Sequence, residues 1–160
     1  MVWKYDEDEK WKEQYTKEKY GKLDRFRFLV LVGPSRMGKT NMAINIFGPE
    51  LTIYVNVQNA EEPNLAGYCF EQTKAILLDE MKPIMASSNK VLFQASISGV
   101  CLRESRCQQF ADWDLFYQIA FIVCTNEWNL QDLAAEDRQW ICENSVVVAI
   151  DSPCWLSGAV

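Results

Sequence analysis

From residue 25 onward, the hydrophobic positions form short continuous runs that polar segments separate. Apolar runs without alternation are typical of strands that are buried on both faces of a sheet. These runs predict strands at residues 25–32, 51–57, 74–78, 116–124 and 145–150. Apolar residues at helical spacing predict a helix at 39–47, and Pro83 suits the first turn of a short helix. This alternation predicts an α/β three-layer domain with a mostly parallel sheet.

Two segments carry a less regular pattern. Residues 91–100 fit either a helix or a strand, and Gly99 indicates a hairpin that continues through residues 100–103. Residues 129–136 have the pattern of a capped helix start, and residues 137–143 that of a second short helix.

Residues 1–24 differ from the rest of the chain, because charges of both signs are interspersed there with aromatic residues. Trp11 and Tyr15 fall on one helical face, and Gly21 suits the end of a helix. The chain therefore divides into an N-terminal helical segment, 1–24, and a domain, 25–160. The segment is open to two interpretations: a solvated terminal helix, or an oligomerisation element that contacts a neighbouring subunit through Trp3, Trp11 and Tyr15.

The composition is that of an ordinary globular domain, with 160 residues, 49% hydrophobic and 24% charged. No uncharged apolar run approaches the roughly 18 residues of a membrane span, and the N-terminus has no apolar signal core, so we expect an intracellular protein without membrane contact. The net charge of −6 argues against a generally basic nucleic-acid coat, but leaves room for a local basic loop or pore. The absence of histidine excludes histidine-based catalysis and histidine-ligated metals. Six cysteines without a Cys-x-x-Cys pair predict buried, reduced thiols.

The loop between the first predicted strand and helix matches Gly-x4-Gly-Lys-Ser/Thr in full. Its glycines let backbone N–H groups surround phosphate oxygens, and the helix that follows adds its dipole. Lys39 is predicted to reach the β- and γ-phosphates, and the Thr40 hydroxyl to bind Mg²⁺. The whole loop is therefore a candidate nucleotide site: Gly33, Pro34, Ser35, Arg36, Met37, Gly38, Lys39 and Thr40.

Polar side chains follow two further buried strands. Asp79 and Glu80 come after the apolar run that ends at Leu78, a position where P-loop ATPases keep a magnesium carboxylate. Asp79 is predicted to hold Mg²⁺, and Glu80 to orient or deprotonate the attacking water. Asn126 follows the apolar run at 121–124 after one residue. At this position its amide could bind that water or the γ-phosphate.

These three elements, in this order, resemble the superfamily 3 helicases, and above all the ATPase domain of the replication-initiator (Rep) proteins of circular single-stranded DNA viruses. GPSRMGKT resembles the Walker A motif of this family, ILLDE its Walker B motif and FIVCTNEW its motif C, with Asn126 as the sensor asparagine. The segments 140–148 and 151–155 resemble the end of that domain. The resemblance covers residues 26–155 and implies a P-loop NTPase fold of the AAA+-like type.

The resemblance also implies sites beyond the phosphate loop. The family carries a basic hairpin between Walker B and motif C that grips single-stranded DNA, and here that stretch contains Arg103 and Arg106. These ATPases complete the site with an arginine from a neighbouring subunit, for which Arg138 is the candidate and Arg106 the next choice. Full-length members carry a histidine-dependent nickase, which the absence of histidine excludes from this chain.

The sequence thus predicts an Mg²⁺- and ATP-dependent DNA helicase or translocase that acts as a hexameric ring on single-stranded DNA in rolling-circle-type replication. Lys39, Glu80, Asn126 and a neighbour's Arg138 would be its catalytic residues, and a host nucleus its location if the source is viral. Two alternatives stay open: a nucleotide-gated assembly or scaffold protein with little turnover, and an RNA helicase of the same superfamily. A small-molecule kinase is disfavoured, because only Arg138 is present where an arginine-rich lid would be expected.

Overall fold

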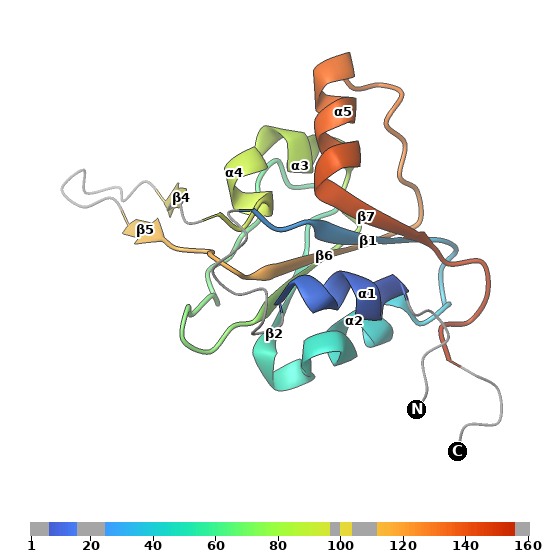
Figure 1. Cartoon of the computed structure of the whole chain (residues 1–160), viewed down its shortest axis with the longest axis horizontal. Coiled ribbons are helices and arrows are strands. Elements are labelled where there is room, and N and C mark those ends of the chain that lie inside the picture. The colour runs from blue at the N-terminus through green and yellow to red at the C-terminus, as the bar shows by residue number, and fades with distance from the viewer. Residues whose placement is uncertain (1–6, 16–24, 97–99, 104–111, 156–160) are drawn as a thin grey trace.

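The computed structural model describes residues 7–15, 25–96, 100–103 and 112–155 (Figure 1). Its centre is a five-stranded, all-parallel sheet in the order β2-β3-β6-β1-β7. The strands are β1 Phe28–Val32, β2 Thr52–Asn56, β3 Ala75–Asp79, β6 Ala120–Thr125 and β7 Ser145–Ala149. The predicted α/β domain with a parallel sheet is confirmed.

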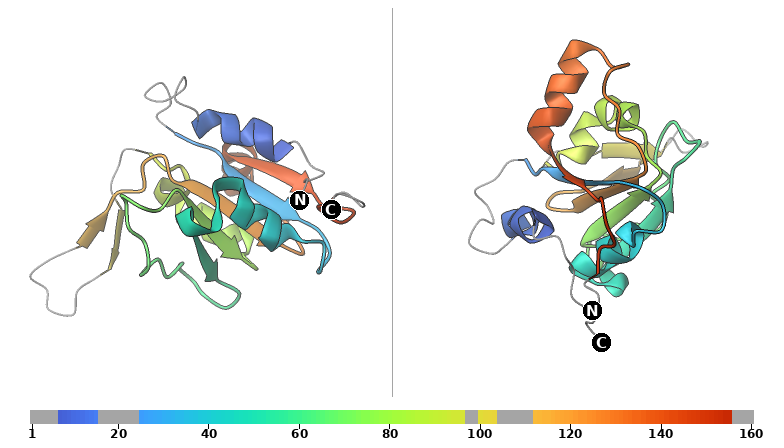
Figure 2. Two further views of the ribbon diagram at one scale, coloured as in Figure 1. Left: turned by 90° about the horizontal axis from the view of Figure 1, so that it is seen from below. Right: turned by 90° about the vertical axis from the view of Figure 1, so that its right-hand side faces the viewer.

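Helices cover both faces of this sheet, which gives the three layers visible in Figure 2. One face carries α3 Pro83–Ser88, α4 Lys90–Phe93 and α5 Ala135–Asn144, and the other α1 Glu7–Lys12 and α2 Lys39–Phe47. Neighbouring residues of a strand enter opposite cores: Phe28 packs in the core under α3, α4 and α5, and Leu29 in the core under α1 and α2. The three central strands β1, β3 and β6 are almost continuously apolar because both of their faces are buried, whereas the edge strands β2 and β7 are only partly buried.

The described part of the N-terminal segment, residues 7–15, packs on its own domain. Helix α1 is followed by a short 3₁₀ turn, Glu13–Tyr15. The Trp11 side chain is only 4% exposed, and its indole N–H donates to the Arg27 carbonyl at 2.6 Å. The interpretation that Trp11 contacts a neighbouring subunit is therefore wrong for this residue, whereas Trp3 lies outside the described residues.

Three further predictions of secondary structure can be compared with the observed backbone. Residues 90–93 are helical, and β4 Val100–Arg103 pairs antiparallel with β5 Asp112–Asp114. A hairpin is therefore present, but both of its strands follow Gly99, and the prediction that Gly99 marks its turn is wrong. The predicted strand at 116–124 begins only at Ala120, because the Ile119 N–H donates to the Phe116 carbonyl in a turn. The predicted helix start at 129–136 is wrong, because the Asn129 side chain accepts the Gln131 N–H in a turn and α5 begins at Ala135.

Two of the cysteines are buried as predicted, Cys124 and Cys154. Cys69 and Cys142 are exposed instead, since both lie outside the two cores. Among the described helices, none has the length and apolar character needed to traverse a bilayer.

Candidate active site

The candidate site lies at the carboxyl edge of the sheet, on the right in Figure 1, where three segments far apart in the sequence meet. Val32 of β1 pairs with Thr125 of β6, and the Gly33 N–H continues the ladder by donating to the Thr125 carbonyl at 3.2 Å. On the other side of β6, the Glu80 N–H donates to the Cys124 carbonyl at 2.7 Å. Parallel pairing therefore brings the predicted phosphate loop, the two acids and Asn126 to one edge.

The loop at residues 33–38 has the irregular backbone that its sequence predicts. Arg36 and Gly38 have positive φ angles of 63° and 81°, and α2 begins immediately afterwards at Lys39. The Met42 N–H donates to the Gly38 carbonyl at 2.9 Å, so the first turn of α2 is formed. A turn of this kind at the N-terminus of a nine-residue helix presents N–H groups and a positive dipole end, which favours an anion.

The Lys39 side chain is 8% exposed and held under the loop. Its ammonium donates to the carbonyls of Gly33 at 2.8 Å and Pro34 at 2.6 Å, and to the Asn126 side-chain oxygen at 3.3 Å. An ammonium has three donors, and these three acceptors satisfy them. The Lys39 charge is therefore fixed at the edge of the sheet instead of extending into solvent.

Asn126 connects the third predicted element to the loop. Its amide nitrogen donates to the Ser35 hydroxyl at 3.1 Å, while its oxygen accepts from Lys39. The Thr125 hydroxyl donates to the Glu127 carbonyl at 2.9 Å and supports the turn that carries Asn126. The sequence assigned Asn126 a role at the phosphate, and the structure brings it into direct contact with the predicted phosphate-binding residues.

Asp79 is the last residue of β3, and Glu80 follows it in a turn beside this loop. The Asp79 carboxylate accepts the Tyr54 hydroxyl at 2.8 Å on one oxygen and the Glu80 N–H at 3.1 Å on the other. Glu80 has a φ of 58°, a left-handed conformation that is costly for a residue with a side chain and often marks a functional position. The Asn56 amide lies 3.5 Å from a Glu80 carboxylate oxygen.

Sequence reasoning missed Tyr54 and Asn56. Both lie on β2, the edge strand beside β3, and Asn56 is the register partner of Asp79. The hydrogen bond to Asp79 raises the pKa of Tyr54 above its ordinary value of 10.0, because the carboxylate stabilises the protonated phenol. The available signal was the position of two polar side chains at the end of the predicted strand 51–57.

A cavity of about 280 Å³ lies between the loop and the ends of β3 and β6. It is lined by residues 35–41 together with Asp79, Glu80, Thr125 and Asn126. Thr40 and Asp79 both line it and offer the hydroxyl and carboxylate oxygens that Mg²⁺ prefers. Mg²⁺ is usually held by one or two such side chains together with substrate phosphates, so the donor set fits this metal. A larger cavity of about 540 Å³ adjoins it and shares Glu80, Thr125 and Asn126.

The segment after β7 returns to the predicted phosphate loop, residues 33–38. The Ile150 N–H donates to the Val32 carbonyl at 2.7 Å, and the Cys154 N–H to the Met37 carbonyl at 2.9 Å. The ring of Trp155 lies so close to Gly38 that a β-carbon there would be 2.6 Å from it. Burial raises the pKa of the Cys154 thiol, which therefore stays protonated behind the loop.

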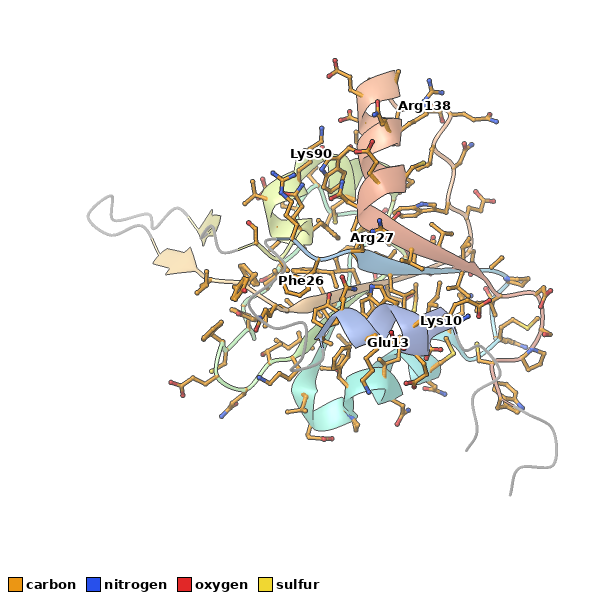
Figure 3. The ribbon with its side chains drawn as sticks, viewed as in Figure 1. Lys10, Glu13, Phe26, Arg27, Lys90 and Arg138 are labelled. Carbon is orange, nitrogen blue, oxygen red and sulfur yellow. The ribbon has the colours of Figure 1, made fainter. Side chains whose placement is uncertain are left out.

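The predicted arginines lie elsewhere. Arg138 is exposed on the half of α5 that is remote from the sheet (Figure 3), and it does not line the cavity at Lys39. Its action on a neighbouring subunit stays a prediction. Arg103 ends β4, where only the backbone is described, and Arg106 lies outside the described residues.

No protein-family model matches the chain, and no curated protein matches it. The resemblance to superfamily 3 helicases therefore depends on the ordered motifs in the sequence.

Proposed function

We propose that the protein binds ATP with Mg²⁺ at residues 33–40 and hydrolyses it, as the ATPase domain of a helicase of superfamily 3. The observation that carries this proposal is the convergence of the Lys39 ammonium, the Asn126 amide and the carboxylates of Asp79 and Glu80 around one cavity. Cation, amide and carboxylate are the groups that phosphoryl transfer to water requires.

Each group has a distinct task in this proposal. The N–H groups of the loop and of the first turn of α2 bind phosphate oxygens, and Lys39 neutralises their charge. Glu80 orients the attacking water, and Asn126, which already contacts Lys39, donates to that water or to the γ-phosphate. Thr40 and Asp79 hold Mg²⁺, which when bound supplies charge neutralisation at the phosphates.

The nucleic-acid part of the proposal comes from the family resemblance. The hairpin of β4 and β5 occupies the chain position of the family's DNA-gripping hairpin, with Arg103 and Arg106 as candidate contacts. In a ring of identical subunits, these arginines would line a shared channel, and Arg138 would act on a neighbour's ATP. Single-stranded DNA is the proposed substrate, and RNA is the alternative.

Phosphate release from Mg²⁺-ATP, with and without single-stranded DNA or RNA, tests the proposal. We expect DNA-stimulated turnover that Lys39→Ala abolishes and that Asn126→Ala lowers by about 10²-fold, the usual effect of removing one transition-state donor. Lys74→Ala is the matched control, because Lys74 is exposed and precedes β3 at the opposite edge of the sheet.

The alternatives give different results in the same assay. Stimulation by RNA alone would replace DNA with RNA as the substrate. Binding of ATP without hydrolysis, at high protein concentration and with nucleic acid present, would overturn the motor and favour a nucleotide-gated assembly. Failure to bind any nucleotide would overturn the proposal as a whole.

A further inference from the structure

We propose that Tyr54 is a positioning residue of the candidate metal site, where its hydroxyl fixes the carboxylate of Asp79 from the neighbouring strand. The inference rests on the proposed ATPase function and adds a residue to it. Tyr54 lies outside the three motifs that indicated the site, and its role follows from contacts in the folded chain.

The contacts of Asp79 carry the argument. One carboxylate oxygen accepts the Tyr54 hydroxyl at 2.8 Å, and the other accepts the Glu80 N–H at 3.1 Å. The Glu80 N–H is shared with the Cys124 carbonyl at 2.7 Å, so the Tyr54 hydroxyl is the stronger of the two restraints on the carboxylate plane, and each oxygen keeps a further lone pair for a ligand. Asp79 is therefore held in one orientation towards the cavity that it lines with Thr40.

The edge strand β2 is placed to do this. Residues 54 and 56 of a strand point to the same side, and the parallel register sets Asn56 directly beside Asp79. The Tyr54 ring is long enough to reach Asp79 along this edge, and Asn56 approaches Glu80 at 3.5 Å. One strand thus directs a polar side chain at each of the two acids.

Hydrophobic packing does not account for a tyrosine at position 54. Its side chain is 48% exposed and belongs to neither of the two buried cores, so little apolar surface is gained from the ring. Strand β2 is held by its own backbone pairing with β3 from Thr52 to Asn56. A phenylalanine at this position keeps the ring and the strand, and removes only the hydroxyl that contacts Asp79.

Partners of this kind orient metal ligands without touching the metal, and their loss typically lowers metal affinity about 10–100-fold. We therefore expect Tyr54→Phe to weaken metal binding, whereas nucleotide binding in the absence of metal stays unchanged. Metal-saturated turnover should recover to within a few-fold of that of the unaltered protein, because the hydroxyl contacts neither ATP nor water in this proposal.

The experiment measures free Mn²⁺ by its paramagnetic signal during titration of the full chain with a non-hydrolysable ATP analogue present. The variants are Tyr54→Phe, Asp79→Asn as the loss of the ligand, and Tyr117→Phe as the control. Tyr117 is a half-buried tyrosine whose ring packs against Phe26, away from the site. The thermal unfolding midpoint of each variant checks that the fold is intact.

We expect Tyr54→Phe to raise the Mn²⁺ concentration for half-saturation at least about tenfold, and Tyr117→Phe to leave it unchanged. Equal Mn²⁺ affinity of the two phenylalanine variants, with Asp79→Asn impaired, would overturn the role of Tyr54 and leave the ATPase proposal standing. Failure of the unaltered protein to bind Mn²⁺ with nucleotide would overturn both.

Discussion

Alanine substitutions at Gly33, Gly38 and Gly67 separate two effects on stability: the clash of an added β-carbon with neighbouring atoms, and the cost of a positive φ angle. Gly33 and Gly38 belong to the predicted phosphate loop, and Gly67 lies outside it. A β-carbon at Gly33 would lie 2.1 Å from the backbone oxygen of Ile150, and one at Gly38 would lie 2.6 Å from the ring of Trp155. At Gly67, no atom lies within 4 Å of the added carbon. A β-carbon at Gly33 would therefore clash with backbone, and one at Gly38 with the Trp155 side chain, which is 39% exposed. One at Gly67 would clash with nothing.

The expected losses of stability follow from these obstacles. Relief at Gly33 requires the backbone at Ile150 to move, which strains the 2.7 Å bond from the Ile150 N–H to the Val32 carbonyl. Overpacking costs about 1–3 kcal/mol and a weakened or lost buried hydrogen bond about 1–3 kcal/mol, so we expect a loss of about 2–6 kcal/mol. At Gly38, the φ of 81° alone costs alanine about 1–2 kcal/mol, and the Trp155 ring can move aside. Gly67→Ala should change stability by no more than about 1 kcal/mol and can increase it.

Urea unfolding of the three alanine variants, followed by tryptophan fluorescence, measures their free energies of unfolding. We expect the largest loss for Gly33→Ala and the smallest for Gly67→Ala. Trp155→Ala combined with Gly38→Ala should recover only the part of the Gly38 loss that arises from the ring, because the φ penalty remains. Gly33→Ala as stable as Gly67→Ala would refute the reasoning, since the return of the chain at Ile150 would then place no demand on the loop.

Three smaller predictions follow from single contacts. Trp11→Phe should lower the free energy of unfolding by about 1 kcal/mol, because it removes the 2.6 Å bond to Arg27 and keeps the aromatic packing; an unchanged urea midpoint would contradict this. Burial raises the pKa of Asp8 above 3.8, so the folded state favours the neutral acid and loses this stabilisation as the pH rises through the folded pKa. Asp8→Asn should therefore raise the melting temperature more at neutral than at acidic pH, and an equal effect at both would refute the assignment. Asp79→Asn should lower the pKa of Tyr54 towards 10.0 in a titration of tyrosinate absorbance, with Tyr54→Phe to identify the signal.

The sequence anticipated those features that depend on local pattern. Strands buried on both faces are uniformly apolar, and the helix at 39–47 follows a loop whose glycines and lysine have a known physical use. The meeting of Lys39 with Asn126 was also predictable, because parallel strands bring their carboxyl ends to the same edge.

The features that the sequence did not predict depend on three-dimensional context. Asn129 has the side chain of a helix cap but accepts the Gln131 N–H in a turn, and both uses are open to the same residue type. The aromatic stripe of the N-terminal segment left open whether Trp11 contacts a neighbouring subunit, whereas in the folded chain Trp11 packs in the core under α1 and α2, beside Tyr15. The contact from Tyr54 to Asp79 spans 25 positions, and no local pattern encodes it.

The phosphate loop is braced on two sides, and this bears on how it could bind an anion. Asn126 and Lys39 hold it from the sheet through Ser35 and the carbonyls of Gly33 and Pro34. The returning chain holds it from behind through Cys154 and Met37. Because these contacts hold the loop and its positive φ angles from two sides, we expect the binding step to require little ordering of the loop. Donors that are fixed before binding stabilise developing charge more effectively than donors that must reorganise, which is the property that a hydrolytic site needs at the γ-phosphate.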